Sequence, residues 1–540
     1  MGSHFPSFLK VFLLSALVTH ITPVFADEAP TVTIASGVII GTTTKPANQP
    51  DLPASANAYL GVPFPKSPPQ RFSPPEAVQP WSSPLQAKAL KPACIQQFSG
   101  KNRDKTMEFF NNPLHHPPGE SEDCLYLNVY TPAGVNATSK KAVMFWIFGG
   151  NLAFGTGGLN YYDGTSLAIN EDVVVVTINY RTNIFGFSNS PEIPFGSQNS
   201  GFLDQRFALQ WVQDNIVNFG GDPKRVMLFG ESAGGESIKQ LLANPPNPLP
   251  FSSAILQSQQ ALSQGNGLTN YKKVLSHFSC TDITCLRAVP ATEIKSYIES
   301  ESLSFAPVNG DGTSVDDVRP SIRSKKWARV PTMFGTNLNE ARIFLAVLGS
   351  NDATTAFNSI VEQVNTSSID APDAHTAVTD AYAEQGITVF DKLLDRVLTD
   401  AIFTCTTSRL STFLDKNSYT TYRYLYSGVF PSVSIFNDAG AYHTSEIPQV
   451  FGTWERSNRF GNATEQQIKL SSFMQKTWAD FAKDPEKGVG WAKVGSTLLG
   501  RELGVLGEGD SAGVTVKRKA TVDYACALYD TVTYFSGLMW

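Results

Sequence analysis

Several features that mark other classes of protein are absent from this 540-residue sequence. Acidic residues outnumber basic ones, 48 against 42, and no Lys/Arg block or basic stripe interleaved with aromatics would follow a phosphate backbone. After the N-terminus, no apolar run approaches the roughly 20 residues that a membrane-spanning helix needs. Nucleic acid is therefore not an expected partner, and we expect no stable membrane insertion.

Cysteine is scarce too, with six residues in the whole chain. No two of them form a C-x-x-C pair and only one histidine, His277, lies near any of them, so nothing indicates a metal or cofactor site. An even number of cysteines in an exported chain predicts disulfides. Sequence order favours pairing between neighbours, namely Cys94 with Cys124, Cys280 with Cys285, and Cys405 with Cys526. Other connectivities stay open.

The N-terminus has the composition of a secretory signal peptide, residues 1–26. A lone Lys10 precedes an apolar run over residues 11–18, and small residues ending in "VFA" place the cleavage after Ala26. The same run is too short for a membrane anchor. We therefore expect a secreted, extracellular glycoprotein, and its N-x-[ST] sequons are Asn136, Asn365 and Asn462.

The rest of the chain, residues 27–540, is predicted to be one α/β domain. Hydrophobic residues make up 42% of the sequence and charged residues 17%, which is enough apolar surface for a large core. Short apolar runs without alternation are typical of strands buried on both faces, and helical stretches such as residues 202–219 lie between them. This succession predicts a mostly parallel sheet with helices on both faces. The runs cover residues 142–148, 173–178, 226–229, 254–256 and 330–334.

Two serines stand in G-x-S-x-G, the pattern of a nucleophile elbow. Ser232 follows the short apolar strand "RVMLF" and precedes the predicted helix "GGESIKQLLA", so a helix N-terminus would face a developing oxyanion. Ser511 follows the glycine-rich "LGVLGEGD" and precedes an alternating strand, which indicates a hairpin turn. The triad of such an elbow runs Ser, acid, His along the chain, and no histidine lies beyond His443. Ser232 is therefore the predicted nucleophile.

The candidate base and acid follow from their positions in the chain. His443 stands in a loop after the strand-like residues 422–426, whereas His277 and His375 have the settings of surface residues. Glu340 comes just after another buried strand, where a carboxylate could orient the imidazole, although alone it would suit a solvated loop. An unperturbed histidine titrates at about 6.5, and we expect the base to titrate near that value.

The oxyanion hole is expected from a second glycine-rich turn, "FGGNLAFG", together with the N–H of Ala233. With these residues in view, the chain resembles the type-B carboxylesterase/lipase family. These α/β-hydrolases include cholinesterases and fungal secreted esterases and lipases, and the fungal proteins are closest in character. The resemblance covers nearly everything after the signal peptide and includes "SEDCLYLNVYTP", "GFLDQRFALQWVQDNIVNFGGDPKRVMLFGESAGG" and "YHTSEIPQVFGT".

The resemblance implies an α/β-hydrolase fold and a secreted serine hydrolase. Such an enzyme cleaves carboxylic esters of small molecules or lipids through an acyl-enzyme, without cofactor or metal. The resemblance also favours the pairing of neighbouring cysteines given above. The implied residues are Ser232 as nucleophile, Glu340 as acid, His443 as base, Gly150, Asn151 and Ala233 as oxyanion donors, and Ser258 and Glu231 as residues that support the triad.

Departures from the family pattern bear on the substrate. Asn151 stands where a third glycine is usual and Leu152 where an aromatic is common, which alters the acyl pocket. No Trp lies between Cys94 and Cys124 to hold a quaternary ammonium, so a choline ester is not the expected substrate. The same segment carries three phenylalanines that could cover the site as a lipase lid does or could pack down: Phe98, Phe109 and Phe110.

The rival interpretation is a catalytically inactive binding or adhesion member of the same fold, since a fold does not fix a function. Relatives of that kind typically lose the nucleophile. Here Ser232, Glu340 and His443 fill all three triad positions, which favours the enzyme.

Ser232→Ala should remove nearly all ester hydrolysis, while Ser511→Ala should leave it close to wild type. The reason is that only Ser232 has a strand before it, a helix after it and a histidine downstream. Initial rates with p-nitrophenyl acetate measure both variants, and thermal melting checks that both are folded. Equal losses of activity in the two variants would rule out this assignment.

Overall fold

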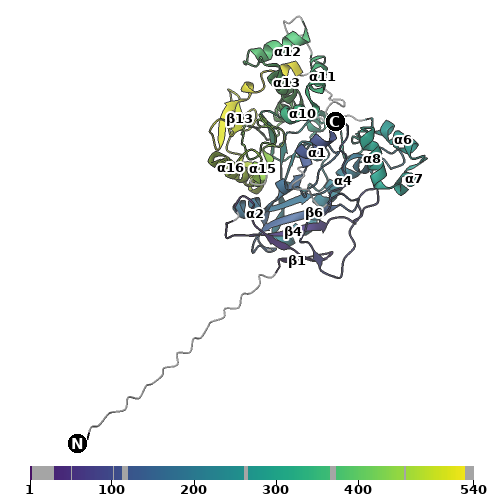
Figure 1. Cartoon of the computed structure of the whole chain (residues 1–540), viewed down its shortest axis with the longest axis vertical. Coiled ribbons are helices and arrows are strands. Elements are labelled where there is room, and N and C mark those ends of the chain that lie inside the picture. The colour runs from purple at the N-terminus through teal and green to yellow at the C-terminus, as the bar shows by residue number, and fades with distance from the viewer. Residues whose placement is uncertain are drawn as a thin grey trace.

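The computed structural model describes most of the chain and is drawn in Figure 1. The predicted signal peptide lies almost entirely outside the described residues, and so does the sequon at Asn365. The described residues are 1–2, 29–49, 51–100, 102–111, 119–260, 266–364, 373–454 and 458–529.

An eleven-stranded sheet forms the centre of the molecule. In the spatial order given below, every neighbouring pair between β13 and β8 is parallel, and β7 lies within this stretch. The antiparallel pairs lie toward the two edges of the sheet. The predicted mostly parallel α/β sheet is thereby confirmed. The order is β14 (Val514–Arg518), β13 (Arg501–Leu506), β12 (Thr421–Tyr426), β11 (Thr332–Asn337), β10 (Ser253–Gln257), β9 (Gly221–Glu231), β7 (Lys141–Ile147), β8 (Val174–Ile178), β6 (Tyr126–Pro132), β4 (Ala56–Pro63) and β3 (Thr42–Thr44). A smaller sheet holds β1 (Thr31–Ile34), β2 (Gly37–Ile40) and β5 (Leu85–Gln86).

The central strands are covered on both faces. Every residue of β8, β10, β11 and β12 is buried. Because successive side chains of a strand point to opposite faces, continuous burial requires packing on each side of the sheet. This explains why β8, β10 and β11 contain apolar runs without alternation, whereas β12, with its buried Arg423, does not read as such a run.

Helices supply that cover. Helix α5 packs against β9 and β10, and α16 packs against β7 and β9. The predicted helix over residues 202–219 exists, but its last turn, Ile216–Phe219, tightens to a 3₁₀ helix before Gly220 in the left-handed region. No helix among the described residues is long and apolar enough to cross a bilayer. The α-helices are α1 (Arg103–Asn111), α2 (Thr165–Glu171), α3 (Asn183–Gly186), α4 (Ser200–Asn215), α5 (Ala233–Ala243), α6 (Gly267–His277), α7 (Ile283–Ala288), α8 (Ala291–Ser300), α9 (Arg319–Arg323), α10 (Ala341–Leu348), α11 (Ser350–Val361), α12 (Ala374–Ala383), α13 (Phe390–Thr399), α14 (Cys405–Lys416), α15 (Ile447–Phe451) and α16 (Glu465–Lys483).

A second hydrophobic cluster lies apart from the main core. It is built from α10 to α14 and the turn at residues 525–529, and Figure 1 places α10 to α13 together at the top of the view. Helix α1 contacts α10, and its Phe109 and Phe110 pack against this cluster. The phenylalanines of α1 are thus held against the body of the protein.

Three disulfides are present, and they join the expected neighbours: Cys94 with Cys124, Cys280 with Cys285, and Cys405 with Cys526. The last of these spans 121 residues and fastens the C-terminal turn to α14. A long closed loop of this kind restricts the unfolded chain most, in the chain-entropy view of disulfide stabilisation.

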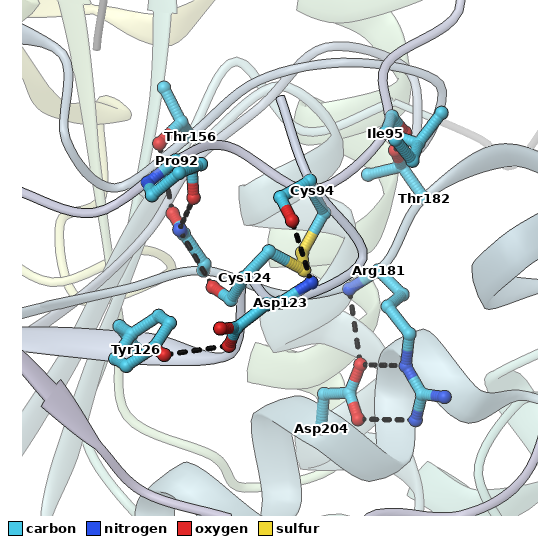
Figure 2. Close-up of a disulfide and its surroundings, with 12 residues drawn as sticks. Pro92, Cys94, Ile95, Asp123, Cys124, Tyr126, Thr156, Arg181, Thr182 and Asp204 are labelled. Atoms are coloured by element: carbon cyan, nitrogen blue, oxygen red, sulfur yellow. Dashed lines mark hydrogen bonds and ion pairs between the residues drawn. A yellow bond between two sulfur atoms is a disulfide. The ribbon is translucent and has the colours of Figure 1, made fainter. Parts of the chain in front are cut away.

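Figure 2 shows the Cys94–Cys124 disulfide beside a buried ion pair between Arg181 and Asp204. Arg181 Nε and Nη2 donate to the two carboxylate oxygens of Asp204 at 2.8 and 2.7 Å, and the Arg181 backbone N–H donates to the same carboxylate. Burial raises the pKa of Asp204, and the guanidinium opposes that rise. The pair therefore depends on both partners being present.

Asp204→Asn should lower the free energy of unfolding by about 3–5 kcal/mol, because it leaves the Arg181 guanidinium buried without its counter-charge. Urea unfolding followed by tryptophan fluorescence measures the loss. Asp438→Asn is the matched control, since Asp438 pairs with Arg342 at the surface with 88% of its side chain exposed. The control should change stability by no more than about 1 kcal/mol. Similar losses in both variants would contradict the expectation.

Candidate active site

Ser232 occupies the sharp turn between β9 and α5. Its φ of 55° and ψ of −121° are unusual for a residue with a side chain, and such strain persists only where the surroundings enforce it. The backbone N–H of Ser232 donates to Gln257 O at 2.9 Å, which ties the turn to the adjacent strand β10. By contrast, Ser511 lies in the hairpin between the antiparallel strands β13 and β14, as predicted.

The turn after β7 lies directly against this elbow. Gly150 has a φ of 103°, and Asn151 and Leu152 follow in the left-handed region with φ of 55° and 57°. A Cβ on Gly150 would lie 2.3 Å from Phe154 O, so no side chain fits there. The backbone N–H groups of Gly150, Asn151 and Ala233 donate no hydrogen bond to any described residue. Since Ala233 begins α5, the three groups are free donors of the kind that binds an oxyanion.

His443 lies in the loop between β12 and α15 with only 1% of its surface exposed. Its Nδ1 is 2.7 Å from Glu340 Oε2, and its Nε2 is 2.9 Å from Glu231 Oε1. The rings of Phe344 and Phe403 lie 5.0 and 4.9 Å from the imidazole. The imidazole is therefore held between two carboxylates and shielded from water.

Glu340 is fully buried between β11 and α10, and so it is no solvated loop residue. Its Oε1 accepts hydrogen bonds from Ser258 Oγ at 2.6 Å and from the Asn337 backbone N–H at 2.7 Å. These two donors leave Oε2 to face His443. The structure thus brings the predicted acid, the predicted base and Ser258 into one chain of contacts.

The two carboxylates decide the charge of the imidazole. Burial alone would lower the pKa of His443, but Glu231 and Glu340 outweigh burial and raise this pKa to about 10. The expectation that the base titrates near an unperturbed value is therefore wrong for this arrangement. Among the described contacts no hydrogen bond joins Ser232 Oγ to His443, because Nε2 faces Glu231.

A third buried carboxylate, Glu446, was missed by sequence reasoning. Its Oε1 accepts from Gln257 Nε2 at 2.9 Å and its Oε2 accepts from Asn337 Nδ2 at 2.6 Å. Burial and the nearby charge of Glu231 raise the pKa of Glu446 to about 8. The only signal in the sequence was its place three residues after His443, which says nothing about burial.

Two adjoining cavities open beside Ser232. The larger is lined by Glu231, Tyr162 and Tyr442 among others, and the smaller is lined by Ser232, His443 and Asn151 among others. Phe109 lines the larger cavity and Phe110 lines both. Both cavities are mostly apolar, which is the usual character of a small-molecule site.

Other predicted sites lie elsewhere. His277 stacks on Tyr297 at the surface and His375 is exposed, so neither approaches Ser232. The sequons at Asn136 and Asn462 are both exposed.

Comparison with known proteins agrees with this geometry. The model described as "Carboxylesterase family" matches residues 28–498, a span that contains Ser232, Glu340 and His443 and ends before Ser511. Acetylcholinesterase 1 of Caenorhabditis elegans is 30% identical over 89% of this chain and 81% of its own length. Carboxylesterase 1D of Mus musculus is 31% identical over 85% of this chain and 86% of its own length. The liver carboxylesterase of Sus scrofa is 32% identical over 84% of this chain and 85% of its own length.

Glu231→Gln should move the acid limb of the kcat/KM profile to lower pH by about one unit or more. A general base must be unprotonated, so a raised pKa of His443 shifts the onset of activity to higher pH. Removal of the Glu231 charge should lower this pKa and shift the onset back toward lower pH. Rates with p-nitrophenyl acetate from pH 5 to 10 measure the limb. Glu340→Gln should lower the same pKa and also the plateau rate. An acid limb that stays in place in both variants would contradict the assignment of His443.

Proposed function

The chain belongs to the carboxylesterase family and is a serine hydrolase of carboxylic esters, and from this premise we propose that Ser232, His443 and Glu340 carry the reaction through an acyl-enzyme. The observation that carries the proposal is the contact of His443 Nδ1 with Glu340 at 2.7 Å, while His443 and Ser232 line the same cavity. Such a contact fixes the imidazole orientation and stabilises its cation.

The first half-reaction starts from neutral His443, which has lost the proton that Glu231 and Glu340 stabilise. Its Nε2 turns from Glu231 to Ser232 Oγ and takes the hydroxyl proton. Oγ attacks the ester carbonyl carbon, and the N–H groups of Gly150, Asn151 and Ala233 hold the resulting oxyanion. The intermediate then collapses, the C–O bond to the alkoxy group breaks, and His443 returns the proton to the departing alcohol.

In the second half-reaction, water takes the place of the alcohol. His443 removes a proton from this water as it attacks the acyl carbon, and the same N–H groups hold the second oxyanion. Collapse breaks the bond to Ser232 Oγ, which regains its proton, and the carboxylic acid leaves. The sequence of steps needs no cofactor.

The alternative of an inactive binding protein has less support. A binding protein has no need for a strained serine, for free N–H donors beside it or for a histidine held by a buried carboxylate. Maintaining these features costs stability, which argues for the chemistry they serve.

We further propose that the protein is secreted as a single α/β domain after cleavage behind Ala26, and that Asn136 and Asn462 carry glycans. Three disulfides support an oxidising compartment. Both asparagines are exposed, as glycosylation requires.

A fluorophosphonate tests the assignment of the nucleophile. It should form one covalent adduct on Ser232 and abolish hydrolysis of p-nitrophenyl butyrate, because an activated serine displaces fluoride from phosphorus. Mass spectrometry of proteolytic peptides locates the adduct, and Ser232→Ala should take up none. Hydrolysis that persists in fully labelled protein, or an adduct at another serine, would overturn the proposal.

A further inference from the structure

Two carboxamide side chains in the smaller cavity take no part in the mechanism above. Gln260 and Asn151 both line this cavity beside Ser232. Apart from the triad residues, Glu231 and Thr444, its remaining side chains are the rings of Phe110, Phe154 and Phe344. The residues Gln260 and Asn151 thus place two polar side chains in a largely aromatic cavity that Ser232 also lines.

Gln260 is buried but unpartnered. Only 8% of the residue's surface is exposed, no hydrogen bond between described residues involves its side-chain amide, and the amide atoms are not among the fully buried unpaired ones, so they remain accessible from the cavity that Gln260 lines. A polar side chain that lines a cavity and makes no hydrogen bond to the protein is available to a ligand that enters the cavity. The Gln260 amide therefore offers a hydrogen-bonding group in the cavity that Ser232 also lines.

The backbone at Gln260 is held in place from the helix of the nucleophile. Lys239 Nζ on α5 donates to the Gln260 backbone oxygen at 2.9 Å, and the same buried ammonium pairs with Glu236 one turn earlier. The neighbouring side chain, Gln259, donates to Thr407 Oγ1 at 3.4 Å instead. The Gln260 backbone is therefore anchored to the helix that follows Ser232, which reduces the ordering of the backbone that ligand binding would require.

We propose that Gln260, together with Asn151, recognises a hydrogen-bonding oxygen on the substrate. The preferred ester carries a carbonyl or hydroxyl oxygen a few atoms from the scissile carbonyl, on an arm whose apolar part packs against the three phenylalanines. An arm without that oxygen desolvates the amide and leaves it unpaired, so it binds less well. This inference rests on the proposed function, because it places the arm of the ester beside Ser232.

Either arm of an ester could carry this oxygen, and matched substrates distinguish the two. For the acyl arm, p-nitrophenyl 4-oxopentanoate is compared with p-nitrophenyl pentanoate. For the alkoxy arm, 4-oxopentyl acetate is compared with pentyl acetate in a pH-stat. The quantity measured is the ratio of kcat/KM for the oxo ester to that for the plain ester, in wild type, Gln260→Leu and the control Gln259→Leu. Differences in intrinsic reactivity cancel when this ratio is compared between variants.

For one of the two pairs, Gln260→Leu should lower the ratio about three- to tenfold, the range of one neutral hydrogen bond. Gln259→Leu should leave it unchanged, because that amide faces Thr407. The pair that responds identifies the arm. A ratio unaffected by Gln260→Leu for both pairs, or lowered equally by Gln259→Leu, would overturn the inference. Failure of the proposed function is separate, since it would appear as Ser232→Ala still hydrolysing the plain pentanoate.

Discussion

The close approach of two turns is the constraint on which the candidate site depends. Strands β7 and β9 are neighbours in the sheet, so the turns that leave them must pass each other almost in contact. A Cβ on Gly149 would lie 2.8 Å from Glu231 O and 2.9 Å from Ser232 Cβ, and one on Gly234 would lie 2.0 Å from Ile147 O. Only glycine allows this distance. The donors of one turn consequently face the serine of the other without any further positioning.

The carboxylates around the imidazole impose a second requirement. Glu231, Glu340 and Glu446 are all buried, and three buried negative charges would be unfavourable without compensation. The protein supplies three donors from the ends of two strands: Gln257 at the end of β10, Ser258 just after it, and Asn337 at the end of β11. These donors do not offset the buried negative charge completely, and the pKa values of His443 and Glu446 are raised for that reason. A protonated imidazole neutralises part of this charge and must give up its proton before it can act as a base.

The parts of the structure that could be predicted are those set by local pattern. Apolar runs predicted the buried strands, and the context of Ser232 predicted the elbow, because each depends on neighbouring residues in the chain. The burial of Glu446, the second hydrophobic cluster and the place of Gln260 could not be predicted. Each arises where segments far apart in sequence meet, as when Gln257 bonds to Glu446 across 189 residues. Polar residues at such positions look like loop residues until the fold is known.

The groups assigned to chemistry and much of the aromatic wall of the cavities are therefore carried by different parts of the chain. The groups assigned to catalysis lie at the ends of parallel strands, where the sheet fixes them, and this is the usual place for sites in open α/β sheets. Much of the aromatic wall of the cavities comes from elsewhere: Phe344 of α10 belongs to the second cluster, and Phe109 and Phe110 of α1 pack against that cluster. Phe344 also contacts the imidazole, so the wall and the base share one side chain. A change in how α1 rests on α10 would alter the shape of both cavities while leaving the strand ends, and with them the chemistry, in place.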